Sequence, residues 1–337
     1  MDSKQLRQAI GRLPRVRLAH LPTPLEECRR YAEKLGGPRI YIKRDDCTGL
    51  AMGGNKTRIL EFTIGRALEQ GADVLIGGAS SQSNHCRQLA AAAAKLGVEC
   101  HIVLAKDHKS SPKQGNLLLD DLLGAQTEMV AVDSIEDLDQ TKQAVADRLR
   151  AKGRRPFIIM QASMRRFGAM GYALCMAEIA EQFRAIGKRL DCLIVCSSSA
   201  TQPGLVFANK VMDLGVRIIG VAPIKWSYDL KDAFLGVLQD MAETLEMEIA
   251  FTPDDLETSE AYVGDQGYGY PAPAANQALR LLAQTEGIIA DPIYSAKALA
   301  ALVDLVGKNT FEAEENVAFL HTGGTPALFA YAEEICS

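Results

Sequence analysis

Short apolar runs alternate with amphipathic segments along most of this chain, and no other feature limits its fold as strongly. The runs occupy residues 40–42, 74–76, 102–104, 157–159, 193–195, 218–221 and 317–320. Apolar runs of this length, separated by helices, are typical of parallel strands that are buried on both faces. Because 337 residues correspond to about two domains at roughly 150 residues each, we predict an α/β fold. It would consist of two three-layer α/β/α domains with mostly parallel sheets.

Two of the intervening helices have recognisable ends. One begins near Thr57, carries an apolar stripe and stops at Gly71. The next extends from about His85 to Leu96 and stops at Gly97. Glycine is common just beyond a helix because it adopts the left-handed conformation without strain. We therefore predict that both segments are helices that lead away from loops at strand ends.

The charge balance and the apolar content exclude several classes of protein. Lys and Arg number 37 and Asp and Glu 42, a net charge of −5, whereas a nucleic-acid binder needs a basic surface. Uninterrupted apolar stretches such as Leu89–Ala94 are far shorter than the roughly 20 residues that cross a bilayer. The first residues carry charges with no apolar segment behind them, so we expect no secretory signal. We expect a soluble, cytoplasmic protein without a nucleic-acid or membrane partner.

Cysteine usage points to the same compartment. Eight cysteines are spread from Cys28 to Cys336 without a Cys-x-x-Cys pair. Disulfide frameworks belong to small secreted chains, so we expect reduced thiols here. The His-Cys pairs at 85–86 and 100–101 are adjacent residues, which is not the looped spacing of zinc ligands. We predict no metal site.

Three polar loops follow predicted strands, at residues 77–85, 197–204 and 321–326. In parallel α/β folds, ligands bind beyond the carboxyl ends of strands. Ser, Thr, Asn and Gly at a helix amino terminus suit an anion, although the same residue types are ordinary helix caps. Capping is the better explanation for any single loop, whereas three such loops together favour a binding site.

Residues 53–56, Gly-Gly-Asn-Lys, stand at the start of the first helix. Gly49 and Gly54 have the gap of an ATP phosphate loop, but Asn55 displaces the lysine by one position, and no Gly-x-Gly-x-x-Gly follows a strand. Glycines here let a flat ligand approach, and a lysine shielded from water favours its neutral, nucleophilic amine. A solvated surface lysine is the alternative, and the spacing alone leaves both open.

Several motifs, in order from about Leu21 to Tyr331, resemble those of the D-cysteine desulfhydrase and 1-aminocyclopropane-1-carboxylate (ACC) deaminase family. They are residues 22–26 (PTPLE), 43–46 (KRDD), 53–58 (GGNKTR), 82–85 (QSNH), 267–269 (GYG), 291–294 (DPIY) and 321–324 (HTGG). Within the family, residues 46–51 and 115–125 look most like L-cysteate sulfo-lyases. The resemblance covers nearly the whole chain.

The resemblance implies a pyridoxal 5'-phosphate (PLP) enzyme of fold type II, the tryptophan-synthase-β fold. It implies a large cofactor-binding domain formed by residues 1–55 and 160–337, a small mobile domain formed by residues 56–159, and a homodimer. The implied activity is a carbon–sulfur lyase. Such an enzyme converts D-cysteine or L-cysteate by β-elimination to pyruvate, ammonia and either sulfide or sulfite.

The resemblance also assigns roles to individual residues. Lys56 would hold the cofactor as a Schiff base and then act on the α-proton of the substrate, with Ser83, Tyr268 and Tyr294 as the other catalytic residues. Asn84 would hydrogen-bond the ring oxygen of the cofactor. The remaining implied contacts are to the cofactor from Ser198, Ser199, Ala200, Thr201, Gln202, Ser295 and Thr322, and to the substrate from Ser83, Gln82, His85, Ser163, Arg165 and Arg166.

Departures from the family pattern bear on the substrate. ACC deaminases carry Glu at the position of Ser295 and Leu at that of Thr322, so the hydroxyls found here favour a desulfhydrase over a deaminase. A neutral hydroxyl at Ser295 would leave the pyridine nitrogen of the cofactor less protonated than a carboxylate would, which suits β-elimination. Residues 197–203, the expected phosphate loop, lack the usual glycines. Residues 161–166 read Gln-Ala-Ser-Met-Arg-Arg, and these arginines would either meet a second anionic group or lie solvated on the surface.

Two alternatives to this lyase therefore remain. The same fold could act on a different amino acid, ACC being the less expected case. A protein of another class, a PLP-binding protein without turnover, is the second alternative.

Overall fold

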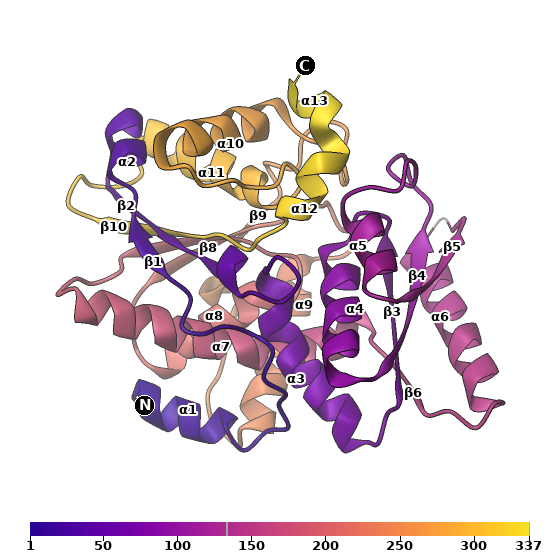
Figure 1. The fold of residues 1–337 in the computed structure, drawn as a ribbon. Coiled ribbons are helices and arrows are strands. Elements are labelled where there is room, and N and C mark those ends of the chain that lie inside the picture. The colour runs from indigo at the N-terminus through magenta and orange to yellow at the C-terminus, as the bar shows by residue number, and fades with distance from the viewer. Residues whose placement is uncertain (133, 337) are drawn as a thin grey trace.

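The structure, a computed structural model, describes residues 1–132 and 134–336, and gives only the backbone of residues 161–163. Its strands form two sheets (Figure 1). The six-stranded sheet has the order β1 (Leu25–Glu27), β2 (Arg39–Lys43), β10 (Asn316–Leu320), β7 (Cys192–Cys196), β8 (Arg217–Val221) and β9 (Glu257–Ser259). The four-stranded sheet has the order β5 (Gln126–Val130), β4 (Glu99–Ala105), β3 (Val74–Ser80) and β6 (Pro156–Ile158). Neighbouring strands are parallel except β1 and β2, which confirms the predicted fold class.

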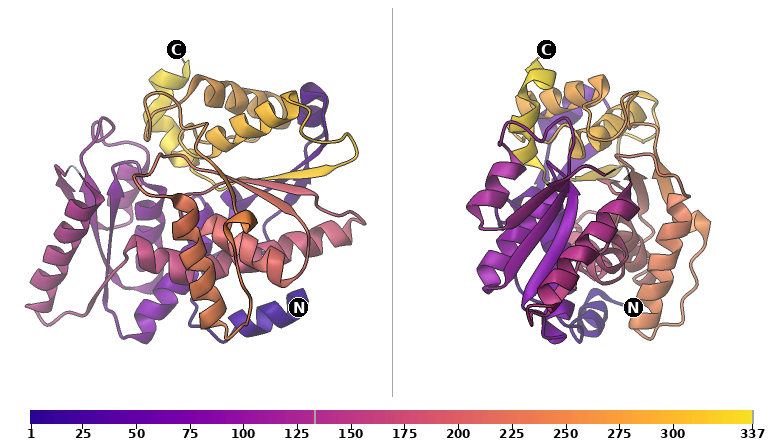
Figure 2. Two further views of the ribbon diagram at one scale, coloured as in Figure 1. Left: turned by 180° about the vertical axis from the view of Figure 1, so that it is seen from behind. Right: turned by 90° about the vertical axis from the view of Figure 1, so that its right-hand side faces the viewer.

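Helices cover both faces of each sheet, as the two views of Figure 2 show. The longer helices are α1 (Ser3–Ile10), α2 (Arg29–Leu35), α3 (Asn55–Glu69), α4 (Asn84–Leu96), α5 (Asn116–Leu122), α6 (Ile135–Arg150), α7 (Gln161–Ala185), α8 (Thr201–Val211), α9 (Leu230–Thr244), α10 (Pro273–Glu286) and α11 (Ser295–Gly307). Short helices α12 (Thr325–Leu328) and α13 (Ala332–Cys336) and the 3-10 turns η1 (Asp45–Cys47), η2 (Pro253–Asp255) and η3 (Phe329–Tyr331) complete the order. The central strands β7 and β10 are buried at every position. Both of their faces therefore need a helical layer.

The sheet pairing explains how the chain is divided. All strands of the four-stranded sheet come from residues 74–158, whereas the six-stranded sheet takes strands from before and after that segment. The domain limits at 55/56 and 159/160 stay a prediction. Helix α3, which begins at the first limit, packs against helix α7, which begins at the second, so the two domains are in contact at these limits. None of the described helices is long and apolar enough to span a membrane, and all eight cysteines are free thiols.

The predicted helix ends agree closely with the structure. Helix α3 begins two residues before Thr57, and Gly71 follows it with a φ of +75°. Helix α4 ends at Leu96, with Gly97 in the left-handed conformation. Strands β1, β5 and β9 were not predicted. They are short or largely exposed edge strands, so they lack the apolar run that marks a buried strand.

A buried ion network ties the first turn of α3 to strand β2, turn η1 and helix α7. Arg58 Nε donates to Asp45 Oδ2 at 2.8 Å, and Arg58 Nη2 donates to Glu178 Oε1 at 3.0 Å. Lys43 Nζ donates to Glu178 Oε1 at 2.5 Å, and the hydroxyl of Tyr172 donates to Asp45 Oδ2 at 2.8 Å. The Arg58 cation keeps the pKa values of both carboxyl groups lowered despite their burial. Two cations and two anions therefore balance, and they fix the helix that carries residue 56.

Candidate active site

The carboxyl ends of parallel strands from both sheets open into one cavity of about 460 Å³. Four segments of its wall lie at or just beyond the ends of β3 (78–80 and 82–85), β7 (196–199), β8 (223, 224 and 226) and β10 (322–323). Three of these four segments belong to the polar loops that the sequence singled out. The volume lies in the range of small-molecule sites. The predicted convergence of these loops is therefore present in the fold.

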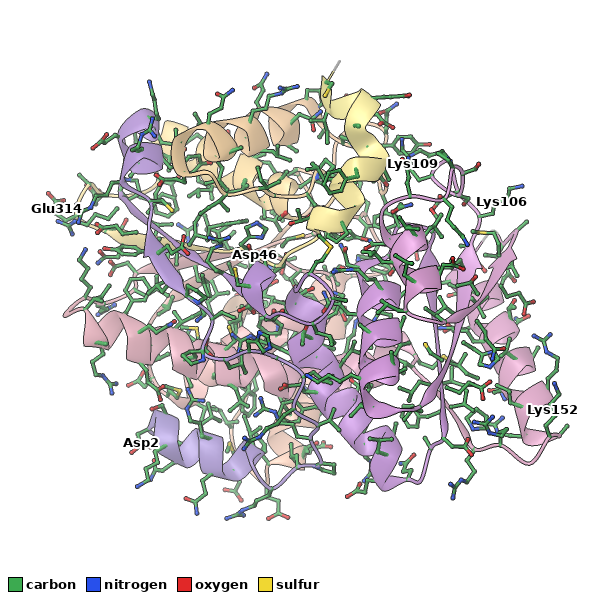
Figure 3. The ribbon with its side chains drawn as sticks, viewed as in Figure 1. Asp2, Asp46, Lys106, Lys109, Lys152 and Glu314 are labelled. Carbon is green, nitrogen blue, oxygen red and sulfur yellow. The ribbon has the colours of Figure 1, made fainter. Side chains whose placement is uncertain are left out.

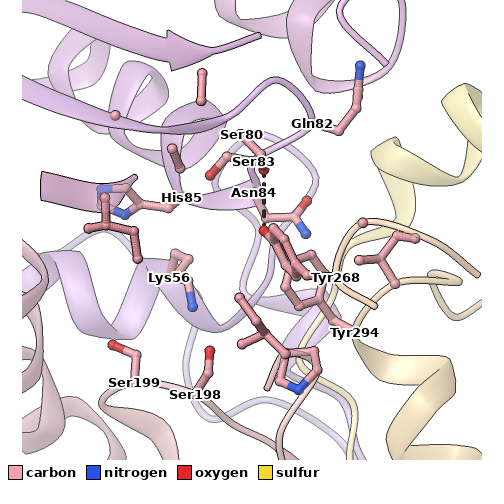
Figure 4. Close-up of a pocket in the computed structure, with 18 of the residues that line it drawn as sticks. Lys56, Ser80, Gln82, Ser83, Asn84, His85, Ser198, Ser199, Tyr268 and Tyr294 are labelled. Atoms are coloured by element: carbon pink, nitrogen blue, oxygen red, sulfur yellow. Dashed lines mark hydrogen bonds between the residues drawn. The ribbon is translucent and has the colours of Figure 1, made fainter. Parts of the chain in front are cut away.

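Lys56 stands at the centre of this cavity (Figure 4). It is the second residue of α3 and follows a sharp turn in which Gly53 and Gly54 have φ values of +67° and +125°. A Cβ on Gly53 would lie 1.9 Å from the carbonyl oxygen of Asp46, so the turn accepts only glycine there. Burial lowers the pKa of Lys56 from 10.5 to about 8. The lysine therefore has a substantial neutral, nucleophilic fraction near neutral pH.

The amino group of Lys56 points towards Ser198 and Ser199 (Figure 4). These serines lead into α8, whose cap residue Ala200 offers no side-chain hydrogen bond to the helix. The Ser199 hydroxyl is buried and has no hydrogen-bond partner among the described residues. Thr201 accepts a hydrogen bond from the Asn55 amide at 3.2 Å. The Gln202 N–H in the first turn donates to Ser197 Oγ at 2.9 Å, so the anion-binding groups left here are the Ser199 hydroxyl and the other amides of the first turn, a set suited to a phosphate-sized anion.

On the other side of Lys56 lies the start of α4. Ser83 caps this helix by accepting from the Cys86 N–H at 3.3 Å. The Asn84 Oδ1 accepts from Asn116 Nδ2 at 3.0 Å, so its amide nitrogen is the group left to donate into the cavity. Both ring nitrogens of His85 are buried without a partner among the described residues. Burial, with Lys56 nearby, lowers the pKa of His85 to about 3, so its imidazole is neutral.

Two tyrosines close one side of the cavity and share a hydroxyl contact. The Tyr268 and Tyr294 hydroxyls lie 2.5 Å apart, and Tyr268 also contacts the Ser80 hydroxyl at 3.3 Å (Figure 4). Burial raises the pKa of both tyrosines above the ordinary value. Both phenols are therefore protonated at neutral pH and can donate a hydrogen bond or pass a proton.

The structure does not bring every predicted residue to the cavity. The Gln202 amide donates to Glu257 O at 2.8 Å and so faces strand β9. The Ser295 hydroxyl donates to Asp291 Oδ2 at 2.5 Å at the start of α11. Ser295 and Gln202 are both outside the cavity lining, as is Ala200, whereas Thr201 and Thr322 line it.

The predicted substrate contacts divide in a similar way. Gln82 lines the cavity but points away from Lys56 (Figure 4), and its side chain donates to Gln114 O at 3.1 Å. Arg165 donates to Ser198 O at 3.3 Å and to the Tyr228 hydroxyl at 2.7 Å, so it buttresses the serine loop from outside. Arg166 is exposed, as the surface alternative expected. The side chain of Ser163 lies outside the described residues.

Several cavity residues were not predicted from the sequence. They are Asp107, His108, Asp139, Lys142, Trp226 and Tyr331, among others. Of these, Asp107 lies just beyond the end of a predicted strand, and that position was a usable signal. Lys142 lies in the middle of a helix and Trp226 in a loop without a motif, so the sequence alone gave no reason to select them.

Helix α5, which packs against α4, carries a buried carboxyl group that leads to a testable pH dependence. Neither oxygen of Asp120 has a partner among the described residues, and burial raises its pKa from 3.8 to about 7, although Arg87 opposes the shift. The folded protein therefore binds this proton more tightly than the unfolded chain, and stability falls as the pH rises between these two values. The native protein should therefore lose free energy of unfolding between pH 5 and pH 8 in a way that Asp120→Asn does not. We expect the difference in free energy of unfolding between the variant and the native protein to grow by about 2–3 kcal/mol over this range.

Urea unfolding at these two pH values measures this gain. Asp121→Asn, a change at an exposed neighbour on the same helix, serves as the control and should show no such gain. Equal pH profiles for Asp120→Asn and the native protein would mean that Asp120 is ionised in the folded state throughout this range.

Known proteins share this architecture. Residues 16–323 match the family model described as "Pyridoxal-phosphate dependent enzyme". The D-cysteine desulfhydrase of Salmonella newport (strain SL254) is 39% identical over 326 residues, covering 96% of this chain and 97% of that protein. The D-cysteine desulfhydrase of Salmonella heidelberg (strain SL476) gives the same values. A solved structure, an ACC deaminase homologue, has a TM-score of 0.89 at 31% identity and covers 98% of both chains. These findings confirm the predicted resemblance and fold type.

Proposed function

Because the chain belongs to the family of pyridoxal-phosphate dependent enzymes, we propose that it is a carbon–sulfur lyase. Its substrate is a small amino acid, D-cysteine or L-cysteate, which it converts by β-elimination. The observation that carries this proposal is a buried lysine with a lowered pKa in the cavity where the polar loops meet. The D-cysteine desulfhydrases, at 39% identity over most of both chains, support the reaction class.

The residues present in the cavity fit pyridoxal phosphate. The amine of Lys56 would bind the aldehyde carbon, and the free amide of Asn84 would donate to the ring oxygen. The unpartnered Ser199 hydroxyl and the amino-terminal turn of α8, whose cap residue Ala200 makes no side-chain hydrogen bond, would hold the phosphate. When bound, the cofactor supplies an electron sink for the carbanion that forms at the substrate α-carbon.

The chain's own residues provide proton transfer and orientation. Lys56, with its pKa near 8, takes the α-proton as a neutral amine. The protonated hydroxyls of Tyr268 and Tyr294 donate to the substrate, and Ser83 hydrogen-bonds its carboxylate or assists the proton transfer. Overall, the Cα–H and Cβ–S bonds break, the sulfur leaves with the bonding pair, and water converts the remainder to pyruvate and ammonia. The substrate plus one water has the same atoms and electrons as pyruvate, ammonia and sulfide or sulfite, so no external oxidant is needed.

The ACC deaminase homologue makes ring opening of ACC the second candidate. On the family resemblance, we also propose that the protein is a cytoplasmic homodimer. Its large domain comprises residues 1–55 and 160–337, and its small domain comprises residues 56–159.

The decisive experiment supplies the protein with PLP and measures products from three substrates. Sulfide from D-cysteine or sulfite from L-cysteate, each with equimolar pyruvate, is the expected result. 2-Ketobutyrate from ACC, with neither sulfur product, would instead identify a deaminase. A protein that gains a visible absorption band but releases no product from any of the three acts on another amino acid or only binds the cofactor.

A further inference from the structure

Beyond Lys56 the cavity reaches a wall formed by the end of β3 and by helix α6. Lys142 lines this wall, and its side chain is only 4% exposed. It stands on the buried stripe of α6 together with Leu138, Val145 and Leu149. That stripe normally carries apolar side chains that pack on the sheet, and lysines are rarely buried this fully. A cation at this position has a desolvation cost that packing alone does not explain.

The neighbouring strand leaves room for this lysine. A Cβ on Gly78 would lie 2.4 Å from Val103 O and 3.3 Å from Lys142 Cδ. The strand is therefore restricted to glycine next to the lysine stem, and the missing side chain lets Lys142 extend along β3 to the cavity.

The ammonium of Lys142 has hydrogen-bonding capacity to spare. Its partner among the described residues is Asp139, one turn earlier on the helix, whose side chain is 33% exposed. An ammonium has three N–H donors, so within the described part of the chain this pairing leaves two of them for a ligand. Asp107, the other carboxylate on the cavity wall among the described residues, is already bound by the hydroxyls of Ser81 and Ser110.

His85 is an independent sign of a ligand in the same cavity. Its ring is buried, and neither nitrogen has a partner among the described residues. Buried polar groups are nearly always hydrogen-bonded in a working protein. The neutral imidazole offers one N–H donor, and Lys142 lies close enough to contribute to its lowered pKa.

We propose that Lys142 and His85 form a subsite for a second acid group on the amino-acid substrate, a sulfonate or a carboxylate carried by the β-carbon. This inference rests on the proposed function, because Lys56 defines where the substrate α-carbon lies. The Lys142 ammonium can donate charge-assisted hydrogen bonds to the oxygens of such a group, and the His85 N–H can donate a further hydrogen bond to them. A thiol accepts hydrogen bonds only weakly. The subsite therefore selects cysteate over cysteine.

The test compares matched amino acids on the PLP-loaded enzyme. Dissociation constants are measured for D- and L-cysteine, D- and L-cysteate and L-aspartate, from the rapid change in visible absorption on mixing. In at least one configuration we expect cysteate to bind about tenfold or more tightly than cysteine, as charge-assisted bonds allow. Lys142→Met, which suits the apolar stripe of α6, should remove most of this preference, whereas Lys142→Arg should retain it.

Lys152→Met is the control, because Lys152 is exposed just beyond the far end of α6 (Figure 3). It should leave the preference unchanged. Lys142-dependent binding of L-aspartate as well would show that the subsite accepts carboxylates in addition to sulfonates. A native enzyme without a preference for cysteate in either configuration, or an equal loss for both ligands in Lys142→Met, overturns the subsite.

Product assays on the same samples separate this inference from the proposed function. Binding that depends on Lys142 without release of sulfite or sulfide overturns the lyase and supports the subsite. Elimination with no preference for cysteate that depends on Lys142 supports the lyase and overturns the subsite.

Discussion

Replacing Lys56 with alanine should abolish both cofactor capture and turnover. The neutral amine of Lys56 is the nucleophile at the centre of the cavity, and the same amine then moves the substrate proton. Loss of the proton transfer alone costs roughly 10²–10⁴-fold in rate, and loss of the covalent attachment adds to it. We expect Lys56→Ala supplied with PLP to lack the visible absorption band of the native enzyme and to release no measurable pyruvate.

Lys95→Ala is the matched control, since Lys95 is an exposed lysine in the last turn of α4. It should retain both the absorption band and the activity. The pKa of Lys56 near 8 adds a second readout. The rate of PLP capture by the cofactor-free protein should be half-maximal at a pH of about 8 and level off roughly one pH unit above it, because only the neutral amine reacts. Native pyruvate release by Lys56→Ala would show that another residue carries the chemistry.

The second large effect concerns stability. Arg58→Met removes the guanidinium that joins Asp45 and Glu178, and both carboxylates are almost fully buried. A buried ion pair that loses one partner leaves an uncompensated charge, which costs about 3–5 kcal/mol. We expect the free energy of unfolding, measured by urea titration with circular dichroism, to fall by this amount. Lys43 remains beside Glu178 but does not contact Asp45.

Arg66→Met on the same helix is the control, because Arg66 forms an exposed pair with Glu69, and such pairs contribute about 0–1 kcal/mol. If Arg58→Met does not fold, Glu178→Gln tests the same network from α7 with a side chain of the same size, and it too should destabilise the protein. If Arg58→Met and Arg66→Met lower the free energy of unfolding equally, the buried network contributes no more to stability than a surface ion pair.

Much of the fold could be predicted because buried parallel strands leave a strong signal. Strand β10, Asn316–Leu320, is apolar at four of its positions and buried at all of them, and the glycines after α3 and α4 marked both helix ends. Strand β5, Gln126–Val130, is largely exposed, so nothing in its composition separates it from a loop. Strand pairing across residues distant in sequence, such as β2 with β10, was not predicted, and only the family resemblance implied that residues 1–55 and 160–337 share a domain.

The site divides along a similar line. Motif residues at the starts of helices, such as Lys56 in α3 and Asn84 in α4, do line the cavity. Side-chain direction is where prediction from the motif stops: Gln202 lies next to Thr201, yet it turns towards strand β9. Lys142 shows the opposite case, because only tertiary packing brings the middle of a helix to the cavity wall. The roles assigned to these residues stay predictions until the variants are measured.

The position of β10 between β2 and β7 has a consequence for how the chain is made. Residues 39–43 leave the ribosome early, but their parallel neighbour at 316–320 is synthesised near the end. The four-stranded sheet has all its strands by residue 158, so this sheet can assemble while β2, which pairs with β1 on one edge, still lacks its partner β10 on the other. An unpaired strand edge is prone to aggregate, so the interval before release is the vulnerable period in biosynthesis. A chain truncated before residue 316 would keep that edge open permanently.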